Sequence, residues 1–138
     1  MSSGDANAIL RVYLAADPGL IGAVGSKIYC PRLPEKVVLP ALGFFVRSGN
    51  STPYIPPLTE PSFQFDCWGR NPIEARSVYT ALYDCLQGIE NVAVVIGTDT
   101  YYIKSAIEEV QGQDIQDVEY PNYHRVLSFF KIMFEIET

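Results

Sequence analysis

The residue types that carry out most protein chemistry are few in this sequence, and they lie far apart. The single histidine, His124, stands beside Arg125 at the start of the last apolar run, with no nucleophile elbow or similar signature around it. A nucleophilic site needs a nucleophile, a base and an orienting group in geometric register. We therefore interpret His124 as a strand-end histidine and predict no catalytic residues and no enzyme.

The cysteines and glycines give no sign of a metal or cofactor site. Cys30, Cys67 and Cys85 lack the close spacing of paired CxxC metal motifs, and their odd number fits reduced core thiols. The run GLIGAVG precedes an irregular segment instead of linking a strand to a helix, so it is a weak phosphate-loop match. The sequence predicts neither a bound metal nor a cofactor.

Carboxylates gather in one segment near the C-terminal end of the chain. No basic residue interrupts this segment, which contains Glu108, Glu109, Asp114, Asp117 and Glu119. It lacks the Asp-rich pattern and central glycine of a calcium loop. Two interpretations remain, a solvated loop or an acidic rim that faces a charged partner or a channel.

Composition and charge limit the classes of partner. The formal net charge is −6 and the ten Lys and Arg residues are scattered, which argues against a nucleic-acid binder. No apolar run approaches the roughly 18 residues that span a membrane, and the N-terminus lacks a signal peptide, so we expect a cytoplasmic protein without a membrane partner. A chain of 138 residues fits a single domain, residues 1–138.

Local patterns predict helices in the first half and strands around them. Asp5 begins a helix that runs to about Ala16, and Asp17 with Pro18 begins a second one that ends near Gly25. Asn71 and Pro72 begin a third helix with an exit near Gly88 and a buried stripe of Ala75, Val78, Tyr79, Leu82, Leu86 and Ile89. Alternation predicts strands at 41–47 and 63–68, where the only tryptophan, Trp68, lies on the polar face. Trp68 is either covered by a helix or anchors a subunit contact.

The other segments complete the predicted fold. Residues 48–61 form a proline-rich loop, 91–96 a short strand or edge, 100–112 a strand with a helical alternative, 111–123 an acidic loop, and 124–137 the clearest strand. The expected fold is α+β, with an antiparallel sheet of about four strands packed on one side by two or three helices.

Four stretches together resemble a known family. They are LAADPGLIGAVGSKIY, LPALGFFV, FQFDCWGRNPIEARSVYTAL and YHRVLSFFKIMFEIE, and their order is similar to that of the tail-completion, or tail-terminator, proteins of long-tailed bacteriophages. The resemblance extends over nearly the whole chain and is weakest between Asn91 and Tyr123.

The resemblance implies a structural virion protein made in the host cytoplasm. Its subunits would form a ring, as a hexamer, that stops growth of the tail tube and joins the head-tail connector protein, while DNA passes through the lumen without specific binding. The candidate contact or lumen residues are Tyr54, Ile55, Trp68, Glu108, Glu109, Asp114, Asp117 and Glu119. Two alternatives stay open: a head-closure or neck connector protein, and a small-ligand-binding α+β domain that would use Asp66, Arg70 and His124.

Overall fold

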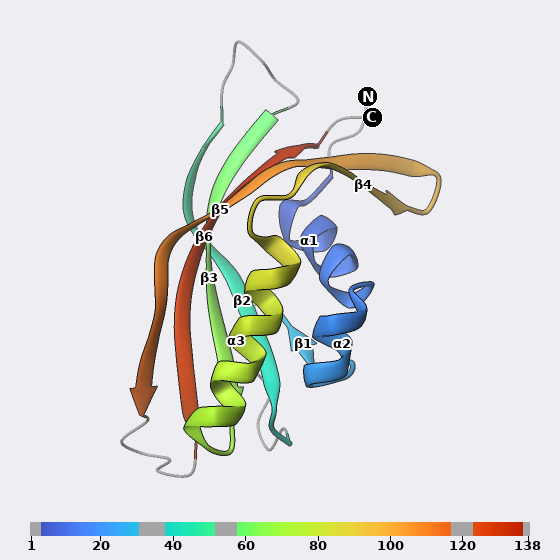
Figure 1. The fold of residues 1–138 in the computed structure, drawn as a ribbon. Coiled ribbons are helices and arrows are strands. Elements are labelled where there is room, and N and C mark those ends of the chain that lie inside the picture. Colours follow the sequence, from blue (N-terminus) through green and yellow to red (C-terminus); the bar gives the residue numbers. More distant parts are fainter. Residues whose placement is uncertain (1–3, 31–37, 52–57, 117–122, 137–138) are drawn as a thin grey trace.

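The computed structural model describes residues 4–30, 38–51, 58–116 and 123–136, and within them the chain forms one curved sheet around a group of helices. The elements are α1 (Ala6–Ala15), α2 (Pro18–Val24), β1 (Ile28–Tyr29), β2 (Ala41–Ser51), β3 (Leu58–Gly69), α3 (Pro72–Leu86), β4 (Glu90–Ile96), β5 (Asp99–Gln116) and β6 (His124–Glu135). The sheet curls into a half-barrel, the helices lie on its concave side, and β4 reaches over α1 (Figure 1).

The expected antiparallel sheet of about four strands is wrong. The sheet has six strands in the order β1-β2-β3-β6-β5-β4, and it is mixed because β1 pairs with β2 in parallel. The short β1 was missed because it has two residues, too few to show alternation, and pairs only at Ile28↔Leu42 and Tyr29↔Gly43. The long strands of this sheet, β2, β3, β5 and β6, are the inner ones, and the right-handed twist that accumulates between neighbouring strands accounts for the curl.

The acidic loop expected at 111–123 is also wrong as far as Gln116, because β5 continues to that residue. The pairing of β5 with β6 shifts register after Glu108 and again after Val110. Each bulge reverses the alternation of faces, so the strand loses the pattern by which it would be recognised. The helical alternative for 105–110 is wrong because these residues lie in β5 and pair with β6, from Ser105↔Met133 to Val110↔Phe129.

The proline-rich loop is shorter than the sequence indicated. Strand β2 extends to Ser51 and β3 begins at Leu58, so Pro61 lies inside a strand, opposite Gly49. The register between β3 and β6 passes from Thr59 to Ser62 without partners for Glu60 and Pro61. A proline is tolerated at such an irregularity because no ladder hydrogen bond is lost there. Residues 52–57, with Tyr54 and Ile55, lie outside the described residues.

The concave face of the sheet and the helices form one aromatic core. The rings of Phe65 and Phe130 meet edge to face at 5.5 Å, and those of Phe63 and Phe134 at 5.8 Å. The predicted stripe is confirmed within α3, where Ala75, Val78, Tyr79, Leu82 and Leu86 are buried, whereas Ile89 lies beyond the helix and is partly buried. Truncating one of these phenylalanines to alanine costs about 3–5 kcal/mol in comparable cores.

Candidate functional site

Glu108, a candidate rim residue, is turned toward the interior of the half-barrel. Its carboxylate accepts hydrogen bonds from the hydroxyl of Tyr79 and from Ser128 Oγ, the latter at 2.9 Å. Ser128 is fully buried in β6, and a buried hydroxyl needs a partner. Glu108 therefore joins three elements, α3, β5 and β6, and its side chain is only partly exposed.

The next carboxylates of β5 are exposed and held by side chains from other elements. Glu109 accepts a hydrogen bond of 2.5 Å from Ser62 Oγ in β3. Asp114 pairs with Arg76 in α3, with 2.9 Å between Oδ1 and Nε. Asp117 and Glu119 lie outside the described residues, so the acidic candidates do not form one described surface.

Trp68 lies on the convex face of the sheet, away from the helices. The guanidinium of Arg125 stands 5.2 Å from its ring centre, and the ring of Tyr123 meets it edge on at 6.3 Å. On the same face Arg47 covers the ring of Phe129 at 4.1 Å. No helix covers Trp68 among the described elements, which leaves the subunit-contact interpretation as an open prediction.

Charges on the convex face are largely paired with one another. Ion pairs join Asp66 to Arg125 at 3.4 Å, Glu60 to Lys131 at 3.1 Å, and Glu135 to Lys104 at 3.1 Å. Burial raises the pKa of Asp66 above its usual value, although Arg125 opposes this. The aromatic and arginine side chains of this face are types enriched at protein contact surfaces, whereas its paired Lys, Asp and Glu side chains are types depleted there.

Helix α3 covers the outer edge of β5 with polar groups. The N–H of Glu108 donates to Gln87 Oε1 at 2.8 Å, and the N–H of Gly112 donates to the Tyr79 hydroxyl at 3.2 Å. Arg76 donates to the carbonyl of Gly112 at 3.2 Å. The carbonyl of residue 106 also accepts a hydrogen bond from the N–H of Gly88 at 3.0 Å. We call residues 106–112 of β5 the covered edge.

Sequence reasoning placed Tyr79 in the buried stripe of α3 and assigned it no polar role. The tyrosine hydroxyl could have predicted a polar role, because a buried tyrosine usually finds a hydrogen-bond partner. Burial, and next the hydrogen bond to Glu108, raise the pKa of Tyr79 to about 12. The residue therefore stays protonated at neutral pH and connects Glu108 to the covered edge.

Strand β4 shows a different edge. Its pairing with β5 runs without interruption from Val92↔Ile103 to Ile96↔Asp99. Within the described part of the chain, no group bonds to the other side of β4. Val95 is 60% exposed on the convex face, and Val94 is buried on the concave face. We call residues 92–96 the open edge.

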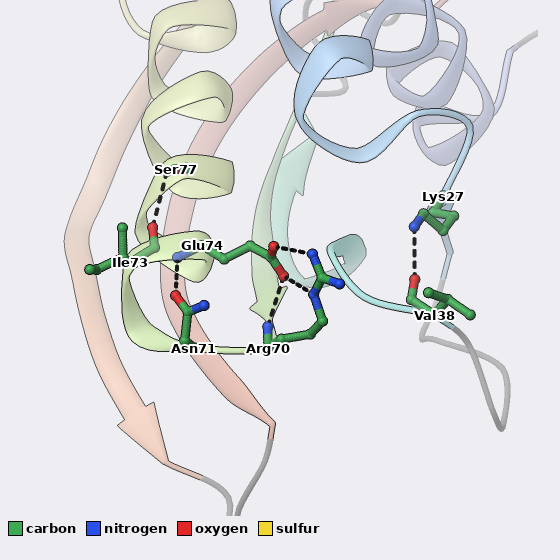
Figure 2. Close-up of polar contacts among 7 residues, drawn as sticks. All are labelled: Lys27, Val38, Arg70, Asn71, Ile73, Glu74 and Ser77. Atoms are coloured by element: carbon green, nitrogen blue, oxygen red, sulfur yellow. Dashed lines mark hydrogen bonds and ion pairs between the residues drawn. The ribbon is translucent and has the colours of Figure 1, made fainter.

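The polar residues suggested for a ligand pocket do not converge. Asp66 binds Arg125 on the convex face, whereas Arg70 binds Glu74 at the start of α3, with 2.8 Å between Nη2 and Oε2. Figure 2 shows that Glu74 also accepts from the N–H of Arg70 while Asn71 caps the helix. His124 lines a separate hollow of about 210 Å³ beside Ala75.

A larger hollow of about 850 Å³ lies between α2 and α3, and Asp17, Asp84 and Cys85 are among its lining residues. Burial, followed by the charge of Asp17, raises the pKa of Cys85 to about 12, so this thiol is not a nucleophile at neutral pH. Among the described residues no group of three or more His, Cys, Asp or Glu side chains is placed to bind a metal. None of the described helices has the length and apolar character needed to span a membrane.

Of three comparisons with known proteins, the comparison of structures finds a shared fold. No protein-family model matches the sequence, and no curated protein does. A solved chain from the "Virion of native gene transfer agent (GTA) particle" is similar in structure, with a TM-score of 0.68 and 18% identity, over 94% of this chain and 94% of that one. At this identity the likeness shows a shared fold, and it extends over nearly the full length of both chains.

Proposed function

We propose that this chain is a structural protein of a phage-like virion and, within it, a tail-terminator subunit. The observation that carries the proposal is the fold shared along 94% of both chains with a component of a gene transfer agent virion. The sequence resemblance to tail-terminator proteins points independently in the same direction. Neither an active site nor a ligand set is needed for this role.

In the proposed role the chain acts by assembly. Identical subunits join head to tail through two different surfaces, and the ring closes when the rotation per subunit divides a full turn. One face of the ring caps the tail tube protein and the other receives the head-tail connector protein. The net charge of −6 suits a lumen through which DNA slides, because like charges repel.

Native mass and electron microscopy test the ring. Light scattering over a range of concentrations should detect a species of about 92 kDa, six copies of a 15.4 kDa chain, and negative stain should show a central hole. An isologous dimer as the only assembled species would contradict a closed head-to-tail ring.

Deletion of the gene separates the terminator from the head-closure alternative. A virion that lacks its terminator should carry tails of excess and variable length, because nothing stops polymerisation of the tube. Loss of a head-closure protein should leave tails of normal length beside unjoined heads. Tail lengths measured in micrographs distinguish the two, and complementation with the wild-type gene is the control.

A further inference from the structure

We propose that the open edge of β4 pairs with the exposed edge of β2 in a second copy of this chain, so that the sheet continues from one subunit to the next. The inference deepens the proposed function, since it names the contact that would join the ring, but the pairing can be tested without a ring. The observation behind it is that the covered edge of β5 is protected by other parts of the chain, whereas the open edge of β4 on the same side of the sheet is not.

Exposed strand edges are usually protected, because their free N–H and C=O groups recruit other strands. Side chains of α3 bond to the backbone of β5 at Gly112, and Gln87, directly after α3, bonds to it at Glu108. The open edge, VAVVI, has no proline, no lysine and no bulge against β5, the usual protective devices. Its exposed Val95 and its β-branched composition favour strand pairing.

A second free edge lies at the other end of the same sheet. Strand β1 covers β2 only at Leu42 and Gly43, where the N–H of Leu42 donates to the carbonyl of Lys27 at 2.9 Å. Since backbone groups alternate along a strand, Phe44 and Val46 direct theirs to the same uncovered side. No described group bonds there, and Val46 is 40% exposed.

The two free edges match in length and in charge. The uncovered part of β2 runs from Phe44 to Ser51, long enough for the seven residues of β4. The hairpin from Glu90 to Asp99 contains two acidic residues and no basic one. The uncovered part of β2 contains the exposed Arg47 and no acidic residue. Opposite charges on the partners favour this docking over pairing of two β4 strands.

The proposed contact joins two different edges, so it can be repeated from one subunit to the next. Strand β4 and the β1-β2 side are the two ends of one sheet, so pairing them is heterologous and each added subunit presents a new open edge. A β4-to-β4 contact would use both open edges and stop at a dimer. The length, charge and symmetry of the two edges therefore favour a second copy of this chain as the partner of the open edge.

Two matched lysine substitutions test the inference by light scattering. Val95→Lys places a charge on the open edge, and Ile107→Lys places one on β5 at nearly equal exposure, 60% against 58%. We expect Val95→Lys to raise the protein concentration needed for association by about tenfold or more, because a lysine on a strand edge opposes pairing and would face Arg47, a like charge, on the partner. Ile107→Lys should change it less than about twofold. Equal effects of the two variants would overturn the inference.

Cross-linking of mixed subunits tests the partner strand. Both proteins carry Cys30→Ser, because Cys30 is only half-buried, whereas Cys67 and Cys85 are buried. One protein also carries Val95→Cys and the other Ser48→Cys, both on the convex face, so that Arg47 is kept. A short thiol-reactive cross-linker should yield dimers in the mixture and not in either protein alone. Val46→Cys, on the concave face, replaces Ser48→Cys as the control and should cross-link far less.

Each outcome has one meaning. Dimers from Val95→Cys alone would indicate β4-to-β4 pairing and contradict the inference. Absence of mixed dimers at the highest soluble concentration would overturn it, including the case in which the chain stays monomeric. Rings that persist in Val95→Lys would refute the edge contact and leave the proposed function standing. Mixed dimers with open filaments and no ring would support the edge contact and refute the terminator role.

Discussion

The covered edge at residues 106–112 and the open edge at residues 92–96 belong to neighbouring strands, but only the covered edge is bonded by polar groups from other parts of the chain. At the covered edge, α3 supplies a hydroxyl and a guanidinium to the backbone of β5, and Gln87, directly after the helix, supplies an amide. Among the described residues, no group forms a hydrogen bond to the free side of the open edge. The protein therefore protects the covered edge and leaves the open edge unprotected, and an unprotected apolar edge can pair with another strand.

The largest expected effect comes from removing the hydroxyl at the centre of the covered edge. Tyr79→Phe leaves the buried N–H of Gly112 without an acceptor, which costs about 1–3 kcal/mol of unfolding free energy. Urea denaturation measures the loss. Tyr83→Phe, one turn further along α3 and exposed, should change stability by less than about 0.5 kcal/mol. Similar losses in both variants would show that the hydroxyl of Tyr79 does not hold the edge.

Alkaline pH should weaken the covered edge through the same residue. The folded state raises the pKa of Tyr79 from 10.0 to about 12, so folding favours the protonated phenol. Its stabilising contribution is therefore complete below pH 10 and is lost as the pH rises towards 12. Urea midpoints of the wild type should fall between pH 9 and 11.5 more steeply than those of Tyr79→Phe. Tyr13, whose pKa burial also raises, contributes equally to both proteins. Parallel pH profiles would contradict the assignment.

A smaller effect is expected at the more exposed end of the covered edge. Gln87→Ala removes the acceptor of the Glu108 N–H, where water can replace it, so we expect a loss of about 0.5–1 kcal/mol. Hydrogen exchange should be faster at the Glu108 amide. Gln113→Ala, exposed on the same strand, should leave exchange at Glu108 unchanged. Unaltered exchange in Gln87→Ala would mean that Gln87 does not protect β5.

The smallest effect should follow the loss of Arg76. Its ion pair with Asp114 is exposed, with side-chain exposures of 42% and 64%, and such pairs contribute about 0–1 kcal/mol. Arg76→Ala should lower the urea midpoint slightly at low salt and less at high salt, since salt screens exposed charges. A loss above about 2 kcal/mol would move the main support of the covered edge from Tyr79 to Arg76.

The sequence predicted best what depends on neighbours along the chain. The cap at Asp17 accepts from the N–H of Leu20 and the cap at Asn71 from that of Glu74, both confirmed, because capping joins residues three apart. The strand predicted at 124–137 is likewise confirmed as β6, which shows alternating burial. The sequence failed at β1, at Pro61 and beyond Glu108, where pairing with a distant strand, not local pattern, decides the conformation.

Local sequence was therefore enough for the helices, for the side-chain caps at Asp17 and Asn71 and for the apolar stripe of α3, whereas Asp5 at the start of α1 makes no side-chain cap hydrogen bond. Only tertiary packing turns Glu108 inward to Tyr79 and Ser128, leaves Trp68 without a covering helix among the described elements, and sets which strand edges stay open. The reason is physical. Caps and stripes follow from the helix and strand periods, whereas an edge is open or covered only with respect to elements far away in sequence, as α3 is to the end of β5.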